Sequence, residues 1–396
     1  MTAPLKRNII IFYLANFFLI LAQSLPHSIL TVLLLDKGLS LSDIAIIQAM
    51  FSLAVLLFEI PSGILADLYS RKFLYILSAF LLIAVSLLVL FFDDFILLAL
   101  AWFIYGLSTA LYSDTLETGL VNEIKRLDFS KHAAFIHKFL RHKNQIQFFS
   151  MLFGSLLGSF LYFIIGLKIY ILAIVFILCA FFCILFFKEQ GLENKEKFLK
   201  KHLFSGLKEL KSSKDLKALF ILALISQIFF QSHYQLWQAF FLEKGVDEKQ
   251  LYLFYVLFQC LGIFVLYLGR KEQGHLLFFN KICILILFCS PLLLVQNFSL
   301  TFTAYMLLVA AFIFLDYKIN ALFNSAVSKE RISLLSAMKS SFSRICAFVF
   351  LLLCSLFLKY FSVSALVFIN FSLALGLTVV LIFFGKKILN FSLITK

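Results

Sequence analysis

The sequence predicts an all-α membrane protein in which twelve transmembrane helices form two pseudo-symmetric six-helix bundles. Three observations lead to this prediction: long unbroken apolar runs, a one-sided distribution of positive charge, and a short repeat between the two halves of the chain. The chain has 396 residues, of which 62% are hydrophobic and 14% are charged. Soluble domains carry roughly 25% charged residues, so this chain belongs in a lipid bilayer.

Apolar runs broken by charged or turn residues divide the chain into about twelve segments. A helix needs roughly 20 apolar residues to cross the hydrocarbon core, and these runs are continuous rather than alternating, which excludes a β-barrel. Pro26 is expected to kink the first span. The predicted spans lie near 8–34, 41–66, 73–92, 95–120, 144–166, 168–187, 217–242, 249–268, 275–296, 299–323, 334–358 and 362–385.

Positive charge identifies the cytoplasmic side. The chain has 35 Lys and Arg residues against 21 Asp and Glu residues, and most of the basic residues fall in loops on one side of the spans. This is the positive-inside asymmetry, which explains the basic balance without a nucleic-acid partner. Lys6 and Arg7 precede the first span, and an even number of spans returns Lys386 and Lys387 to the same side. Both termini are therefore expected in the cytoplasm.

The two halves of the chain repeat each other. The sequence L-D-K-G at 35–38 returns as L-E-K-G at 242–245, and the spacing from glycine to Arg-Lys at 63–72 recurs at 262–271. This pattern indicates an internal duplication, which is frequent in secondary transporters. The predicted domains are an N-terminal six-helix bundle at 1–187, a cytoplasmic basic linker with an amphipathic helix at 188–216, and a C-terminal six-helix bundle at 217–396.

A charged turn between spans two and three carries the most specific motif. Glu59, Gly63 and Asp67 are spaced four apart and share one helix face, and Arg71 and Lys72 follow at the cytoplasmic turn. Gly63 allows a neighbouring helix to approach. Asp67 can accept hydrogen bonds from Arg71 and from an adjacent helix N-terminus. We expect a gate motif of Gly63, Asp67, Arg71 and Lys72 that latches the cytoplasmic side; a plain basic turn is the alternative.

This pattern resembles the major facilitator superfamily. The sequence G-x-x-x-D-x-x-S-R-K at 63–72 is similar to the family signature G-x-x-x-D-[RK]-x-G-[RK]-[RK], with Leu68 and Ser70 as departures. The Glu-Ile-Pro-Ser-Gly run ahead of Asp67 is similar to that of bacterial efflux-like members. Trp102 stands where many proton-driven members have an arginine. The resemblance implies the fold of that family, secondary transport, and a monomer in the bacterial inner membrane.

In that fold, spans one, four, seven and ten face a central pathway. Polar residues form stripes at helical spacing on these spans, where lipid would leave their amides and hydroxyls unsatisfied. Such a lining suits an amphipathic organic molecule; a sugar site uses similar residues, and polar contacts between packed helices are the alternative. The candidate substrate-site residues are Asn16, Gln23, His27, Trp102, Tyr105, Thr109, Tyr112, Gln227, Gln231, Tyr234, Gln235, Trp237, Gln238, Tyr305, Asp316, Asn320 and Arg344.

Charged residues inside a membrane are costly and are functional candidates by default. Asp316 and Arg344 are expected to form an ion pair. Glu59, Asp114 and Glu117 have no basic partner within their own spans. We expect one of these three acids to load and release a coupling proton; contact with a cytoplasmic Lys or Arg is the alternative.

Enzyme chemistry is not expected. His132, His137 and His142 recur every five residues, but residues five apart on a helix diverge by about 140°, so the three cannot converge on one metal. The sequence also lacks a GxxxxGK[ST] phosphate loop. It therefore predicts no metal, no cofactor and no enzymatic activity.

The sequence predicts a secondary active transporter that moves a small organic, amphipathic molecule across the cell membrane by alternating access. Proton-coupled efflux is the favoured mode. The main alternative is an uptake symporter for a metabolite such as a sugar, nucleoside or organic acid. A non-transporting sensor or scaffold is the third possibility, although a static scaffold has no need of a gate.

Overall fold

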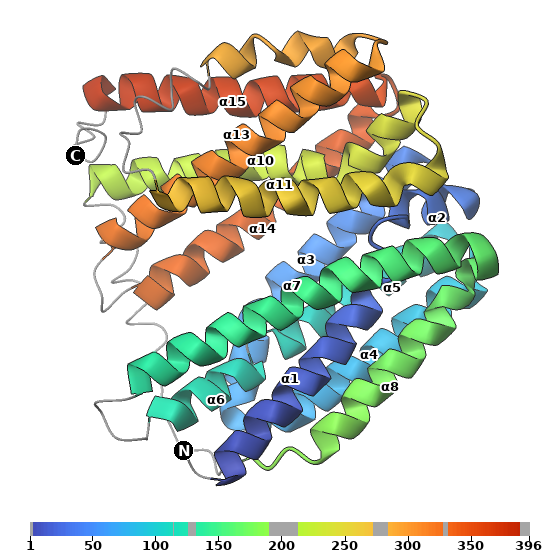
Figure 1. Ribbon diagram of the computed structural model, residues 1–396, viewed down its shortest axis with the longest axis vertical. Coiled ribbons are helices and arrows are strands. Elements are labelled where there is room, and N and C mark those ends of the chain that lie inside the picture. The colour runs from blue at the N-terminus through green and yellow to red at the C-terminus, as the bar shows by residue number, and fades with distance from the viewer. Residues whose placement is uncertain are drawn as a thin grey trace. The chain divides into compact units, whose positions relative to one another are not determined.

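The computed structural model describes residues 3–113, 115–125, 132–189, 213–271, 284–327 and 332–388. Every regular element in these residues is helical (Figure 1). The chain divides into two compact units, Met1–Lys195 and Glu196–Lys396. The predicted linker and its amphipathic helix lie almost wholly outside the described residues.

Unit 1 begins with a broken helix. The structure ends α1 (Ala3–Ser24) before Pro26 and starts α2 (Leu30–Asp36) after it, so the predicted kink in span one is a full break. Proline has no N–H to continue the helical ladder, and the chain closes two turns instead, from the His27 N–H to the Ser24 carbonyl at 3.1 Å and from the Ile29 N–H to the Pro26 carbonyl at 3.1 Å.

The other helices of unit 1 are α3 (Leu41–Leu68), α4 (Arg71–Phe91), α5 (Phe95–Tyr112), α6 (Thr115–Lys125), α7 (His132–Ile165), the short η1 (Gly166–Lys168) and α8 (Ile169–Leu185).

Side-chain caps set where several of these helices begin. Ser40 and Asp43 form a reciprocal capping box at the start of α3. The Ser70 hydroxyl accepts from the backbone of α4, and Asp94 accepts from two N–H groups of α5. Such caps satisfy the donors that a helix N-terminus leaves open. Each cap follows directly on a break in the apolar pattern.

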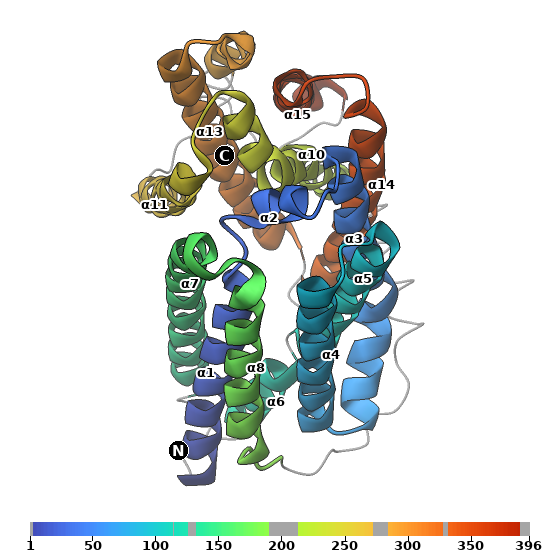
Figure 2. The same cartoon turned by 90° about the vertical axis from the view of Figure 1, so that its right-hand side faces the viewer.

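Small residues let α7 pack closely on α1, as the Gly154 and Gly158 spacing predicts. A Cβ placed on Gly158 would lie 1.9 Å from the Leu25 carbonyl oxygen. The Ser155 hydroxyl donates to the Ser24 carbonyl at 3.1 Å, which ties α7 to the end of α1. Figure 2 shows α1 lying between α7 and α8. These close approaches hold the two helices at backbone distance, as small residues do in membranes.

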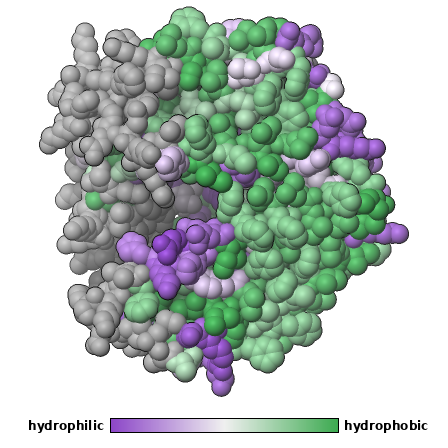
Figure 3. Space-filling view, in the orientation of Figure 1, coloured by the Kyte–Doolittle hydropathy of each residue, from purple (hydrophilic) through white to green (hydrophobic). Residues whose placement is uncertain are grey.

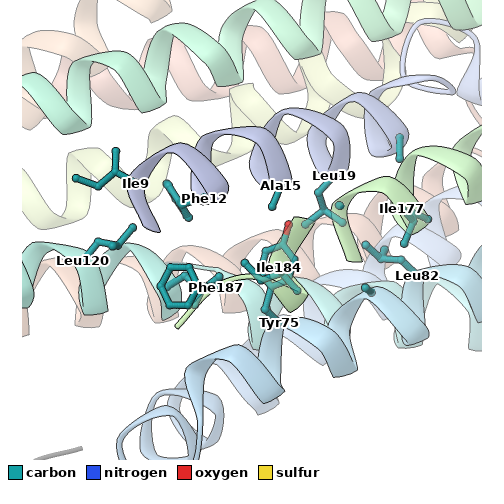
Figure 4. Packing of buried hydrophobic residues seen from close by; sticks show 14 of the residues in the cluster. Ile9, Phe12, Ala15, Leu19, Tyr75, Leu82, Leu120, Ile177, Ile184 and Phe187 are labelled. Atoms are coloured by element: carbon teal, nitrogen blue, oxygen red, sulfur yellow. The ribbon is translucent and has the colours of Figure 1, made fainter. Parts of the chain in front are cut away.

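The core of unit 1 lies where α1, α4, α6 and α8 meet. Buried side chains from all four helices point toward one another, including Leu19 on α1, Tyr75 on α4, Leu120 on α6 and Ile184 on α8 (Figure 4). Each is at most 2% exposed. α3 and α4 pack on α5 beside this cluster.

Unit 2 is organised around α10 and a core of aromatic rings. α10 packs against α13, α14 and α15, and α11 packs on α13. The Phe229 ring of α10 stacks on Phe312 of α13 at 3.8 Å and lies 4.3 Å from Phe371 of α15, measured between ring centroids. The described helices are α10 (Lys214–Glu243), η2 (Glu248–Gln250), α11 (Leu251–Lys271), η3 (Ser290–Leu294), α13 (Phe298–Ala326), α14 (Ile332–Phe357) and α15 (Val363–Ile388).

The repeated L-D-K-G and L-E-K-G sequences form the same turn in the two units. Gly38 and Gly245 have φ of 83° and 82°, a left-handed conformation that glycine adopts without strain. The Lys37 ammonium donates to the Phe92 carbonyl at 3.0 Å, and the Lys244 ammonium donates to the Val295 carbonyl at 3.0 Å. Burial lowers the pKa of the Lys244 ammonium, and the neighbouring Glu243 carboxylate opposes that shift. The matched geometry supports an internal duplication.

The described residues hold ten segments that are long and apolar enough to cross a membrane. One of them, Phe135–Leu185, has 51 residues and contains both α7 and α8. The predicted ninth span is described only from residue 284, where Ile284–Leu294 forms a shorter apolar segment. Large apolar side chains are widely exposed, with Phe91 at 70% and Phe186 at 72%, and the face in Figure 3 is mostly hydrophobic. The protein is therefore a multi-pass membrane protein.

Candidate functional site

The gate motif lies at the junction of α3 and α4. α3 continues through Pro61 and ends at Leu68, and Ser70 caps α4. The Asp67 side chain lies outside the described part of the structure, so its latching role stays a prediction. Arg71 and Lys72 form the first turn of α4, where their contacts are well defined.

Glu189, just beyond α8, binds the N-terminus of α4. Its carboxylate accepts from the Arg71 N–H at 2.7 Å, from the Lys72 N–H at 3.4 Å and from the Ser70 hydroxyl. A carboxylate at a helix N-terminus satisfies open N–H donors and interacts favourably with the helix dipole. This contact joins residues more than a hundred positions apart in the chain.

Lys72 makes the reciprocal contact. Its ammonium donates to the Leu185 carbonyl at 2.5 Å and to the Phe187 carbonyl at 3.0 Å, which are among the open acceptors that a helix C-terminus leaves. Glu189 therefore caps the start of α4 while Lys72 caps the end of α8. We call this reciprocal contact, made by Ser70, Arg71, Lys72 and Glu189, the α4–α8 clamp.

Two glycines near the clamp have different surroundings. A Cβ on Gly119 of α6 would lie 2.9 Å from Nη1 of Arg71, so this glycine makes room for the guanidinium. A Cβ on Gly63 would meet no atom within 4 Å among the described residues. Within the described part of unit 1, the close helix approach that we expected at Gly63 is not formed.

The three acids expected to couple protons have different positions. Glu117 of α6 forms an ion pair with Lys143 of α7 at 2.5 Å, and both side chains are less than 20% exposed. This partner lies on the next helix, so Glu117 makes the contact with a lysine outside its own span that the sequence left open as the alternative. Glu59 is half-buried in α3, and Asp114 lies outside the described residues. Among the described residues, no group of three His, Cys, Asp or Glu side chains is placed to hold a metal ion.

In unit 1, the structure brings together part of the predicted substrate site. The Tyr112 hydroxyl donates to Oε1 of Gln23 at 3.1 Å, which joins α5 to α1. Thr109 donates to the backbone carbonyl of Tyr105 at 2.9 Å, a contact within its own helix. His27 lies in the turn between α1 and α2. Gln23, His27, Tyr105, Thr109 and Tyr112 are half-buried, whereas Asn16 and Trp102 are buried at 7% and 4% exposure.

In unit 2, the predicted polar stripe on α10 divides into an accessible and a buried part. Tyr234 is 59% exposed, and Gln227, Gln231 and Gln235 are half-buried. Gln238 and Trp237 are buried at 3% and 5% exposure. Trp237 flanks the predicted stripe, and its ring contacts Phe258 of α11 at a centroid distance of 5.4 Å.

Tyr305 of α13 is fully buried rather than placed at an accessible surface. Its hydroxyl lies 3.0 Å from Nδ1 of His233 on α10, and its ring lies 5.0 Å from the rings of both Phe240 and Phe241. Tyr305, Trp237 and Trp102 therefore act as packing residues in this structure.

Asp316 has a partner that the sequence reading missed. Its carboxylate accepts from Nδ2 of Asn320 at 2.7 Å and from the Ser226 hydroxyl at 3.3 Å. Oδ1 of Asn320 in turn accepts from the Lys339 ammonium on α14 at 2.5 Å. Among the described residues, Asp316 and Arg344 form no ion pair, and Asn320 instead links Asp316 to Lys339. We call Asp316, Asn320 and Lys339 the charged cluster of unit 2.

Glu189 and Lys339 are the functional residues that the sequence reading missed. Lys339 lies inside predicted span eleven, where a charged residue is a functional candidate by default, so its position in the sequence could have identified it. Glu189 lies in a charged segment past span six, and no local pattern links it to residue 70.

Comparison by sequence finds similarity to one family, and comparison by structure finds the same fold in solved transporters. The model of the Major Facilitator Superfamily matches residues 12–118, a stretch that includes the gate motif. The uncharacterized MFS-type transporter YxaM of Bacillus subtilis (strain 168) is 25% identical over 256 residues, which cover 62% of this chain and 61% of YxaM. Over residues 12–118, the chain is similar to the major facilitator superfamily. The resemblance predicted from the gate motif is thereby confirmed for this part of the chain.

Solved structures of the family share the fold along almost the whole chain. The nucleoside transporter NupG aligns with a TM-score of 0.71 and 12% identity over 100% of both chains. A bacterial homologue of the iron transporter ferroportin in an inward-facing state aligns with a TM-score of 0.71 and 15% identity over 96% of this chain and 98% of the other. A bacterial homologue of the human lysosomal transporter Spinster gives a TM-score of 0.69 at 13% identity, over 96% of this chain and 95% of the other. At these identities, the likeness concerns the fold.

Proposed function

We propose that this protein is a proton-coupled secondary transporter that moves a small, partly hydrophobic organic molecule by alternating access. The proposal includes twelve spans in two six-helix halves, 1–187 and 217–396, with both termini and the linker at 188–216 on the cytoplasmic side of a bacterial inner membrane. The transporter acts as a monomer and requires no cofactor. Rocking of two halves around a midplane site is the mode of transport that such duplicated folds use.

The α4–α8 clamp is the observation that carries this proposal. It fixes the gate motif to Glu189, which lies where the chain leaves the last helix of unit 1 and enters the linker to unit 2. A movement of the gate turn would therefore act on Glu189 and on the end of α8. The predicted Asp67 latch would make and break its contacts at this same turn.

The polar side chains of the two units support a mostly neutral organic substrate. Gln23 and Tyr112 in unit 1 and the accessible Tyr234 in unit 2 offer hydrogen bonds beside aromatic rings. Such surfaces hold amphipathic molecules by stacking and by a few directed polar contacts. Export driven by proton entry is the favoured direction.

Proton-linked uptake of a metabolite is the second candidate, and the charged cluster of unit 2 favours it. Asp316 and Lys339 place opposite charges within apolar helices, where charge is costly unless it serves a function. A metabolite that carries a charged group would find a partner there, whereas a neutral hydrophobic drug would not.

Reconstitution in liposomes tests transport itself. Purified protein is given a panel of dyes, drugs and metabolites with and without an imposed pH gradient, and entry and exit are measured separately. Movement of at least one compound that follows the pH gradient is the expected result. A transport rate that does not change with the pH gradient would reject proton coupling. If no compound is transported, the result would support the scaffold alternative.

The gate is tested by Asp67→Asn. This change should slow transport while the melting temperature stays that of the wild-type protein, because the latch is made in only part of the cycle. Asp247→Asn is the matched control, since this acid caps the short helix η2 in unit 2 and has no part in the gate. Wild-type transport rates in Asp67→Asn would reject the latch.

A further inference from the structure

The charged cluster of unit 2 is an ion pair with an amide between its two charges. Nδ2 of Asn320 donates to Asp316 at 2.7 Å, and Oδ1 of the same amide accepts from Lys339 at 2.5 Å. Within the described residues, the carboxylate and the ammonium make no direct ion pair. The three side chains therefore form a short chain of polar contacts from α13 to α14 that is neutral as a whole.

Lys339 has unused capacity to bind a ligand. An ammonium has three N–H donors, and among the described residues Asn320 takes one of them. The ammonium also lies 4.8 Å from the centroid of the Phe323 ring, a contact that uses no N–H. Lys339 and Asp316 are both half-buried, so a ligand can reach them without displacing buried core residues.

The groups around Asp316 are few. Ser226 of α10 donates to it at 3.3 Å, and Tyr234 of α10 lies within electrostatic range, with Tyr255 of α11 beside that tyrosine. Lys339 is the cation that acts on Asp316. Tyrosines stay neutral near pH 7, so among the described residues Asp316 and Lys339 carry the charge of this cluster.

Charge balance limits what the site can bind. The empty cluster is neutral, and burying an uncompensated charge in an apolar environment is strongly unfavourable. An anion bound to Lys339 would leave the Asp316 carboxylate without compensation unless a proton enters with the anion. An anion and one proton together restore the neutral state.

We propose that Lys339 binds the carboxylate group of the substrate while Asp316 takes up one proton from water, so that a monocarboxylic acid and a proton are carried together. This proposal rests on the proposed transport function. It selects the second candidate named there, proton-linked uptake of a metabolite, in which substrate and proton move in the same direction. A phosphate ester carries up to two negative charges near pH 7, which the single ammonium cannot balance.

Matched pairs of acids and amides test the proposal. The probes are benzoate with benzamide, indole-3-acetate with indole-3-acetamide, and hexanoate with hexanamide, because each pair shares one apolar body. Melting temperature against probe concentration gives the affinity for the protein in detergent. An indicator dye in weakly buffered solution reports protons taken up on binding. Liposome flux of the same probes reports transport.

At least one acid should bind more tightly than its amide, with uptake of one proton and with affinity that falls as the pH rises. Lys339→Gln should weaken this binding by about tenfold or more, since it removes the charge partner of the ligand. Asp316→Asn should bind the acid without proton uptake and without the pH dependence. Lys318→Gln is the control, because its ammonium lies over Phe314 at 5.4 Å on the same helix but outside the cluster.

Several results would overturn the proposal: amides that bind as well as their acids, acid binding without proton uptake, or a panel in which no acid binds. If Lys339→Gln does not fold, the double variant Asp316→Asn with Lys339→Gln removes both charges together and should lose acid binding in the same way. Flux of the amides without flux of the acids would overturn the carboxylate site and leave the transport function standing. No flux of any probe, or of the broader compound panel, would overturn the transport function itself.

Discussion

Replacing Glu189 by alanine tests the α4–α8 clamp most directly. The Glu189 carboxylate accepts from the Arg71 N–H at 2.7 Å and from the Ser70 hydroxyl. A hydrogen bond to a charged group contributes about 1.5–3 kcal/mol, and an anion at an exposed helix N-terminus adds about 0.3–1 kcal/mol. Because Glu189 is only half-buried, we take the lower ends of both ranges. Glu189→Ala should lower the free energy of unfolding by about 2 kcal/mol.

This loss should appear as a lower melting temperature of the purified protein in detergent. A change of 1 kcal/mol shifts the melting temperature by roughly 2–4 °C in a domain the size of unit 1, so Glu189→Ala should melt roughly 4–8 °C below wild type. Glu189→Gln keeps a hydrogen-bond acceptor but loses the charge, so its melting temperature should lie between those of Glu189→Ala and the wild-type protein. A Glu189→Ala protein that melts within about 1 °C of wild type would refute the reasoning.

Asp94→Ala is the matched control for the clamp. Asp94 caps α5 by accepting from the Ile96 N–H at 2.9 Å and the Leu97 N–H at 3.1 Å, so its loss also removes a carboxylate from a helix N-terminus. Both variants should lose stability, but only Glu189→Ala should slow transport per folded molecule. Equal slowing by the two variants would mean that stability, rather than the clamp, limits transport.

Three further variants probe packing and polar contacts. Gly158→Ala should destabilise the protein by about 1–3 kcal/mol through overpacking, because its Cβ would lie 1.9 Å from a carbonyl oxygen of Leu25; an unchanged melting temperature would contradict the close approach of α7 to α1. The losses of stability caused by Glu117→Gln and by Lys143→Gln should not add up in the double variant, because the two residues form one ion pair. A double-mutant cycle of melting data should give a coupling free energy of about 0.5–3 kcal/mol, whereas additive losses would show that the ion pair contributes nothing to stability. Tyr305→Phe should cost about 1–3 kcal/mol because it leaves its buried histidine partner unsatisfied, and wild-type stability in chemical unfolding would count against that hydrogen bond.

The apolar pattern predicted most helices of the protein but not their interruptions. Hydropathy treats residues 8–34 as one span because Pro26 and His27 lie between strongly apolar stretches. The structure ends the helix at Ser24, since the missing proline N–H and the tie from Ser155 to the Ser24 carbonyl favour a turn there. Such a break depends on a contact between segments that are distant in the sequence, and a hydropathy pattern along the chain contains no information on such contacts.

The candidate site was predictable where one helix defines it. The period of α10 correctly grouped Gln227, Gln231 and Tyr234, since residues three and four apart share a face. The period does not show that Trp237, which flanks this face, is covered by Phe258 of α11. The contact of Glu189 with Ser70 joins two loops, and no spacing rule within one segment could have found it.

The twin turns at 35–38 and 242–245 impose a length restraint on each half of the chain. Lys37 and Lys244 reach the carbonyl at the end of a later helix only if the left-handed glycine after each lysine ends the first helix at that residue. One inserted residue would rotate the lysine by roughly 100° and shift it by about 1.5 Å, which would carry the ammonium away from its acceptor. An epitope tag or a cleavage site placed in either turn should therefore disturb the protein more than its surface position suggests.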